Sequence, residues 1–247
     1  MRAREAALLR AKAGYVAAAR RVGRRVTGRP VPPRERRWRH WARSLGAVYD
    51  VPEMVALDVP WWTYSAIDTV DRWLADRPRP IRVFEYGSGA STFWLARRAD
   101  EVHAVEHHRG FADSIAAPLA AFGNVHLRVV EPAPSANPAV PSAKEGQRGL
   151  DFAAYVASVD DAGGRFDLVV IDGRAREACL ARALPHLAPD GLIVFDNSRR
   201  ARYRPAIATS GLSELRLRGL TPTLPYPEQT SLLTATPSWV RRRHRPR

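Results

Sequence analysis

The chain has 247 residues, of which 45% are hydrophobic, and this is enough for one domain with a substantial core. No stretch approaches the roughly 18 uncharged apolar residues of a membrane-spanning helix, and no N-terminal run resembles the core of a signal peptide, so we expect a cytoplasmic protein. The single cysteine, Cys179, excludes an intrachain disulfide.

The net charge of +14 is concentrated at the two ends of the chain. Residues 1–45 hold 14 basic residues against Glu5 and Glu35, and residues 241–247 hold five arginines, so the part between them is slightly acidic. Basic ends are typical of solvated tails, and the alternative is contact with an anionic surface, either a membrane or nucleic acid. No defined nucleic-acid motif accompanies them. We predict a basic N-terminal appendage over 1–45, a folded domain over 46–240 and a basic tail over 241–247.

The first element of the folded domain is a predicted helix over Trp61–Leu74. Ile67, Val70 and Leu74 recur at helical spacing, and the segment ends shortly before Pro78. Two aromatic residues besides Trp61 lie at its start, Trp62 and Tyr64. We interpret the aromatic cluster as core packing, and a lid over a ligand is the alternative.

Short apolar segments and helix-sized segments then alternate along the chain. Such alternation predicts a parallel sheet with helices on both faces. A loop rich in proline over 131–150 follows the third strand, and it borders either a substrate pocket or only the surface. The predicted strands are Arg82–Glu85, Val102–Glu106, Val125–Val130, Asp167–Ile171 and Leu192–Phe195, followed by Leu215–Leu217 and Ser231–Thr234.

A glycine-rich turn follows the first predicted strand. Gly87, Ser88 and Gly89 lead into a predicted helix over Phe93–Arg98. Glycines let the backbone turn sharply and approach a ligand closely, and a helix N-terminus offers unpaired N–H groups. Glu106 ends the next strand, where a carboxylate can accept hydrogen bonds from both hydroxyls of a ribose. The turn and the acid together predict a nucleoside cofactor.

Two residues decide which nucleoside cofactor we expect. The dinucleotide-binding fingerprint has a third glycine that lets the helix pack close under a pyrophosphate, and here that position is Thr92. Glu85, directly before the turn, would repel a pyrophosphate but suits the ammonium group of an amino acid. Both residues favour S-adenosylmethionine, and a nicotinamide-dependent oxidoreductase is the alternative.

Four segments in this order resemble class I S-adenosylmethionine-dependent methyltransferases: residues 85–89, 105–106, 166–173 and 189–197. The resemblance spans roughly residues 60–236. It implies an α/β, Rossmann-like methyltransferase fold with a mostly parallel seven-stranded sheet, helices on both faces and a C-terminal antiparallel hairpin. We expect an enzyme that methylates oxygen on a small molecule or glycan. A non-enzymatic protein that binds nucleic acid or a membrane surface is a further alternative.

The resemblance also implies where the cofactor lies. The methionine part of S-adenosylmethionine would contact the glycine turn and the start of the helix, and the ribose would contact Glu106. Asp172 would lie beside the reacting methyl group. The expected cofactor-binding residues are Glu85, Tyr86, Gly87, Ser88, Gly89, Ser91, Thr92, Glu106, His107 and Asp172.

Asp172, Asp196 and Asn197 are the expected catalytic residues. They resemble the three oxygen ligands by which catechol-type O-methyltransferases hold a divalent cation. Those enzymes carry a lysine three residues after the first aspartate, where this chain has Ala175. We therefore predict a metal-free site in which Asp172 orients the acceptor or takes its proton, and a cation held by all three is the alternative. Outside a site, Asp196 and Asn197 would cap a helix that begins near Ser198.

His107 and His108 follow the ribose acid directly. Either imidazole has the chemistry of a base. Their position beside Glu106 places them nearer to the adenosine than to the methyl group, so we favour packing or contact with the adenine.

Overall fold

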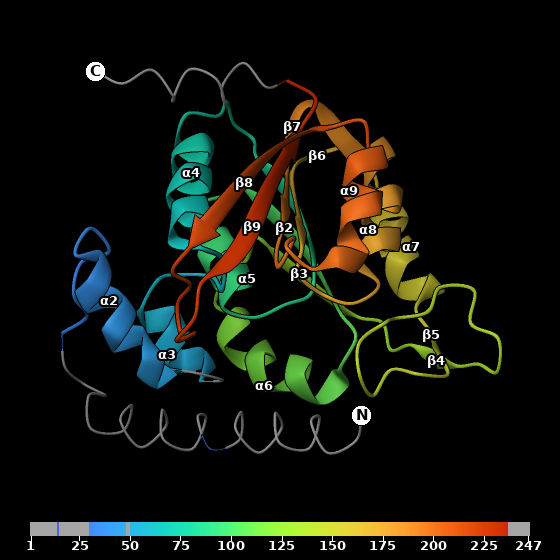
Figure 1. Cartoon of the computed structure of the whole chain (residues 1–247), viewed down its shortest axis with the longest axis horizontal. Coiled ribbons are helices and arrows are strands. Elements are labelled where there is room, and N and C mark those ends of the chain that lie inside the picture. Colours follow the sequence, from blue (N-terminus) through green and yellow to red (C-terminus); the bar gives the residue numbers. More distant parts are fainter. Residues whose placement is uncertain (1–13, 15–29, 48–49, 237–247) are drawn as a thin grey trace.

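A computed structural model describes residue 14, residues 30–47 and residues 50–236 of the chain. A seven-stranded sheet in the order β3-β2-β1-β6-β7-β9-β8 forms its centre (Figure 1). The first five of these strands are parallel, and β9 is antiparallel to both β7 and β8. The strands are β1 (Arg82–Tyr86), β2 (Glu101–Glu106), β3 (Val125–Val129), β6 (Phe166–Ile171), β7 (Leu187–Phe195), β8 (Ser213–Gly219) and β9 (Glu228–Thr234).

All seven predicted strands and the C-terminal antiparallel hairpin are confirmed. The largest difference is at β7, which begins at Leu187 instead of Leu192. Its pairing with β6 is irregular between Phe166 and Leu168, so the first residues of β7 extend the strand beyond the apolar segment. Sequence periodicity does not detect this start, because Pro189, Asp190 and Gly191 are residue types that are depleted in strands.

Helices cover both faces of the sheet, as predicted. Successive strand residues point to opposite faces, so Val83 belongs to one apolar core and Phe84 to the other. Two helices, α4 and α5, pack on the first face, and α7, α8 and α9 pack on the second (Figure 1). The α-helices are α2 (Arg37–Ser44), α3 (Val51–Ala56), α4 (Tyr64–Ala75), α5 (Ala90–Ala96), α6 (Arg109–Leu119), α7 (Ala153–Ala162), α8 (Arg176–Ala183) and α9 (Arg204–Thr209).

The predicted helix over Trp61–Leu74 begins three residues later, at Tyr64. Thr63 caps it, because its hydroxyl accepts a hydrogen bond from the backbone N–H of Ala66 at 3.4 Å. Trp62 and Tyr64 are buried in the core, which agrees with the packing interpretation.

Residues 30–47, which we place mostly in the N-terminal appendage, contact the domain. Trp41 Nε1 donates a hydrogen bond to the carbonyl of Leu224 at 2.9 Å, and the backbone N–H of Thr223 donates to Ser44 Oγ at 3.0 Å. The ring of His40 lies 2.7 Å from Tyr64 Oη. These contacts favour a domain that begins near residue 30, earlier than the predicted residue 46. Apart from residue 14, the rest of the appendage and the tail 241–247 lie outside the described residues.

The loop over 131–150 contains a short antiparallel pair that projects beside α7 (Figure 1). Its two strands are β4 (Ala133–Pro134) and β5 (Leu150–Asp151). In the part of the chain that the structure describes, no helix is both long and apolar enough to cross a membrane.

Candidate active site

A cavity of about 990 Å³ opens at the carboxyl ends of β1, β2, β6 and β7. The chain reverses its direction across the sheet between β1 and β6, and open α/β sheets bind ligands at such a point. The loop over 131–150 borders this cavity through Ser142, Ala143 and Lys144, and its contact with a substrate stays a prediction.

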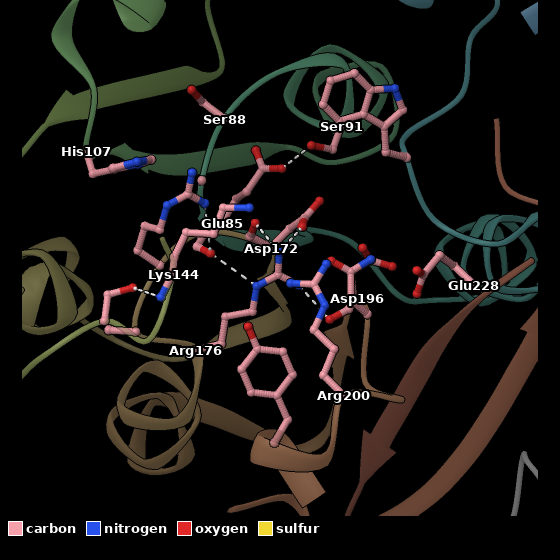
Figure 2. A pocket seen from close by; sticks show the side chains of 18 of the residues that line it. Glu85, Ser88, Ser91, His107, Lys144, Asp172, Arg176, Asp196, Arg200 and Glu228 are labelled. Atoms are coloured by element: carbon pink, nitrogen blue, oxygen red, sulfur yellow. Dashed lines mark hydrogen bonds and ion pairs between the residues drawn. The ribbon is translucent and has the colours of Figure 1, made fainter. Parts of the chain in front are cut away.

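Glu85 lies at the end of β1 and is 1% exposed. Its carboxylate accepts hydrogen bonds from the hydroxyls of Ser91 and Thr92, the latter at 2.6 Å (Figure 2). Burial raises the pKa of Glu85 to about 8, although the two hydroxyls oppose the rise. A cation placed in the cavity beside Glu85 would favour the charged carboxylate.

The glycine turn brings two loops of the sheet close together. Gly87 has a φ of +105°, and a Cβ on it would lie 3.3 Å from the backbone N of Gly173. Gly89 has a φ of +149°, and its backbone N–H donates to Thr92 Oγ1 at 3.0 Å. Gly87 therefore allows the β1 turn to pack on the β6 turn, and it also lines the cavity, where a position against a ligand stays a prediction.

Not every residue of the predicted cofactor set reaches the cavity. The side chain of Tyr86 is fully buried in the core, and its hydroxyl donates to the carbonyl of Val156 at 2.8 Å. Strand alternation explains this, since Glu85 and its neighbour must face opposite sides of the sheet. Gly89 and Thr92 also do not line the cavity, and Thr92 acts by holding Glu85.

Glu106 ends β2 and is 3% exposed, with a set of donors around it. It accepts hydrogen bonds from the backbone N–H and hydroxyl of Ser88 at 3.2 and 3.0 Å, and from the backbone N–H groups of His107 and His108, both at 2.9 Å. Burial alone would raise the pKa of Glu106, but the His107 side chain and these donors outweigh burial and hold it below its ordinary value. Glu106 is therefore a charged acceptor at neutral pH.

The two histidines after Glu106 have different surroundings. His107 Nδ1 lies 2.7 Å from Glu106 Oε1, and its ring lies near Phe152 and Tyr155. His108 Nδ1 accepts the backbone N–H of Phe111 at 3.0 Å and so caps α6. Both line the Glu106 end of the cavity, which agrees with packing and leaves contact with an adenine as a prediction.

Asp172 and Asp196 come together around one arginine. Arg176 Nη2 donates to Asp172 Oδ1 at 2.7 Å, and Arg176 Nη1 donates to the backbone carbonyl of Asp196 at 2.5 Å (Figure 2). The hydroxyl of Thr230 donates to Asp196 Oδ1 at 2.8 Å. Burial raises the pKa of both carboxyls, and the charge of Asp172 contributes to raising that of Asp196 to about 7.

Asn197 lines the same cavity and has a φ of +49°, a left-handed conformation that asparagine tolerates. The expected helix near Ser198 is absent from the described structure, because a turn and a short 3₁₀ segment precede α9 at Arg204. Asp196 and Asn197 are therefore not an N-cap there.

Several cavity residues were missed by sequence reasoning. Arg176 had a usable signal, because it follows Asp172 by four residues at the start of a helix, where the two side chains can meet. Trp61 also lines the cavity, so the aromatic cluster divides between core and site. Lys144, Arg200 and Glu228 come from loops and from β9, and no local pattern marks them.

Residues 84–198 match the family described as a methyltransferase domain. No curated protein matches the sequence. Similar solved structures include a candidate O-methyltransferase from Klebsiella pneumoniae (19% identity, 68% of this chain and 77% of that one, TM-score 0.48). A second is a methyltransferase-like protein from Silicibacter pomeroyi (20% identity, 72% of this chain and 91% of that one, TM-score 0.45). A third is a precorrin-6y C5,15-methyltransferase from Geobacter metallireducens (16% identity, 69% of this chain and 88% of that one, TM-score 0.47).

The family match includes the glycine turn, Glu106, Asp172 and Asp196, which are the residues that the fold brings to one cavity. The sheet has the seven mostly parallel strands and the terminal antiparallel hairpin that the sequence resemblance implies. Residues 84–198 therefore match a methyltransferase domain, and the sheet that contains them is consistent with the class I type.

Proposed function

We propose that this protein is a S-adenosylmethionine-dependent methyltransferase that methylates oxygen on a small molecule or glycan. The observation that carries the proposal is the placement of Glu85, Glu106 and Asp172 at the ends of three neighbouring strands around one cavity. In their order across the sheet, Glu106 on β2 matches a ribose, Glu85 on β1 matches an ammonium group and Asp172 after β6 matches a reacting centre. A nicotinamide-dependent oxidoreductase is disfavoured by the match to the methyltransferase-domain family.

The residues present fit the cofactor. Glu85 is a buried carboxyl whose charged form needs a cation, and the ammonium group of a methionine moiety supplies one. Glu106 is already charged, and a ribose diol would replace the Ser88 hydroxyl among its donors. The cavity also exceeds the volume of one nucleoside, so it has room for an acceptor.

S-adenosylmethionine, when bound, supplies a methyl group on a sulfonium that is open to in-line displacement. The chain has to orient the acceptor, exclude water and accept the proton of the acceptor hydroxyl. Asp172 suits the last task, because burial raises its pKa and only its Oδ1 is held by Arg176. We propose Asp172 as the base and Asp196 and Asn197 as residues that position it and the acceptor.

We further propose that the site works without a divalent cation. The guanidinium of Arg176 already pairs with the Asp172 carboxylate and donates to the Asp196 backbone carbonyl, and its charge lowers the pKa of the Asp196 carboxyl, so a positive charge already serves both acids. The donor set is therefore not the free trio of oxygen ligands that a hard cation takes.

Calorimetry tests the cofactor: S-adenosylhomocysteine should bind, and NAD should not. Turnover is then measured as release of S-adenosylhomocysteine with a panel of hydroxylated aromatic acids and sugars, with and without EDTA. We expect activity to survive EDTA and to fall by about 10²- to 10⁴-fold in Asp172→Asn. Loss of activity in EDTA that Mg²⁺ restores would instead support a metal held by Asp172, Asp196 and Asn197.

A further inference from the structure

Two arginines at the Asp172 side of the cavity, Arg174 and Arg200, have side-chain N–H groups that donate no hydrogen bond to another described side chain. Arg174 lies in the turn after β6 and is partly buried. Its Nε is buried without a hydrogen-bond partner, and its Nη1 has only a long contact of 3.5 Å with the carbonyl of Gly173. Among described residues, the guanidinium of Arg200 has no hydrogen bond or ion pair. An unpaired buried donor such as Arg174 Nε is costly, so a ligand that fills it is favoured, whereas Arg200 is exposed and offers its donors from the rim of the cavity.

Both guanidiniums lie near the proposed reaction centre. Burial raises the pKa of Asp172, and the charges of Arg174 and Arg200 oppose this rise together with that of Arg176. Figure 2 shows Arg200 reaching toward Asp172 from the side of Asp196. Arg176 is committed to these aspartates, whereas the other two arginines are not.

We propose that Arg174 and Arg200 form an anion subsite that holds a carboxylate or phosphate group of the methyl acceptor, next to the hydroxyl that is methylated. This inference rests on the proposed methyl transfer. Guanidinium forks bind both anion types through paired charge-assisted hydrogen bonds. Glu177 and Glu228 also line this end, and they would select against a second anionic group.

The cofactor has a carboxylate of its own, but its position should differ. That carboxylate is attached to the carbon that carries the ammonium, so it must lie beside Glu85 at the end of β1. Arg200 follows β7, which is two strands away from β1 in the sheet. Neighbouring strands lie about 4.8 Å apart, so the end of β7 that precedes Arg200 lies roughly 10 Å from the Glu85 strand, whereas Arg174 follows β6, the strand beside it.

The test uses protein saturated with S-adenosylhomocysteine, so that the cofactor carboxylate is already in place. Benzoate, phenyl phosphate and neutral benzamide are titrated by calorimetry at constant ionic strength. We expect one of the two anions to bind at least about tenfold more tightly than benzamide, and the stronger anion identifies the acceptor group as carboxylate or phosphate. Arg200→Gln and Arg174→Gln should each remove about tenfold of that affinity.

Arg199→Gln is the matched control, because Arg199 is exposed, adjacent to Arg200 and outside the cavity lining. Equal binding of benzamide and both anions, or unchanged anion affinity in both cavity variants, would overturn the subsite. Weaker S-adenosylhomocysteine binding in Arg200→Gln would assign this arginine to the cofactor instead. If the wild-type protein binds no S-adenosylhomocysteine, the proposed function fails, and the same titration of ligand-free protein still decides whether an anion subsite exists.

Discussion

At the scale of single residues, two buried glutamates differ because their donors differ. Glu85 receives two hydroxyl donors and keeps a raised pKa, whereas Glu106 receives backbone and side-chain donors and the nearby His107, and its pKa is lowered. The number and charge of the donors decides which effect exceeds desolvation. One acid is therefore prepared for a cationic ligand and the other for a hydroxyl-rich one.

The protonation of Glu85 predicts a pH dependence of cofactor binding. Its folded-state pKa of about 8 lies above the ordinary value, so the carboxyl is mostly neutral at pH 7 and its ionisation as pH rises destabilises the ligand-free protein. An ammonium ligand beside Glu85 favours the charged carboxylate, so binding lowers the pKa of Glu85 and releases its proton. We expect S-adenosylhomocysteine to bind more tightly as pH rises from about 6 to 7.5, above which the ligand amine itself titrates.

Calorimetry in two buffers of different ionisation enthalpy measures the proton released on binding. The wild-type protein should release close to one proton at pH 7, and Glu85→Gln should release none. Binding without proton release in the wild type would show that Glu85 is already charged or does not meet the ammonium.

Replacing Glu106 by Gln should weaken binding of S-adenosylhomocysteine by more than about tenfold, because charge-assisted hydrogen bonds to the ribose are lost. Glu131→Gln is the control, since Glu131 is exposed and pairs only with Arg109 among described residues. The 2′,3′-dideoxy analogue should bind the wild type as weakly as the natural ligand binds the variant. Equal affinity of the wild type for both ligands would remove the ribose role.

At the scale of elements, the glycine turn holds two loops together. The β1 turn and the β6 turn pack backbone to backbone at Gly87 and Gly173, and Glu85 and Asp172 lie beside this contact. The distance between the proposed ammonium site and the proposed base therefore depends on a position where a Cβ would meet the opposite backbone at 3.3 Å and a positive φ favours glycine.

Gly87→Ala should lower the free energy of unfolding by about 1–3 kcal/mol, because the alanine Cβ meets Gly173 and the positive φ is strained. Thermal or denaturant unfolding of the ligand-free protein measures this loss. Gly123→Ala is the control, since a Cβ at Gly123 has open space around it. If the Gly87→Ala protein is fully stable but does not bind the cofactor, Gly87 contacts the ligand and is not needed for packing of the two turns.

At the scale of the whole molecule, a segment before the predicted domain completes it. α2 contacts the β8–β9 connection through Trp41 and Ser44, and it contacts α4 through His40. Arg43 adds a nearly buried ion pair with Glu53 of α3 at 2.6 Å. Because this helix has partners on three elements, we propose that it is part of the folded domain.

Deleting residues 1–29 should preserve cooperative unfolding and binding of S-adenosylhomocysteine, because no described contact is removed. Deleting residues 1–45 should lower the midpoint of thermal unfolding strongly or prevent folding, since α2 leaves Tyr64 and the β8–β9 connection uncovered. Circular dichroism of the two truncated proteins distinguishes the boundaries. Equal stability of the two truncated proteins would support the predicted boundary, with a separate appendage over 1–45.

The amino-acid sequence by itself determined the strands, the glycine turn and the position of Glu106. These features depend on residues that are close in the chain, so periodicity and spacing report them directly. The alternation of side chains along a strand explains why Glu85 faces the cavity while Tyr86 does not. Which of the two faces the cavity became clear only from the structure.

Only the tertiary structure decided the surroundings of the proposed base. Asp196 meets Thr230 on β9, and Arg176 connects Asp172 with the strand end at Asp196. Arg200 and Lys144 reach the cavity from loops that no pattern connects to it. The burial that raises the pKa of Asp172 and the charges that oppose it come from distant parts of the chain, because strands adjacent in the sheet are separated in sequence by entire helices.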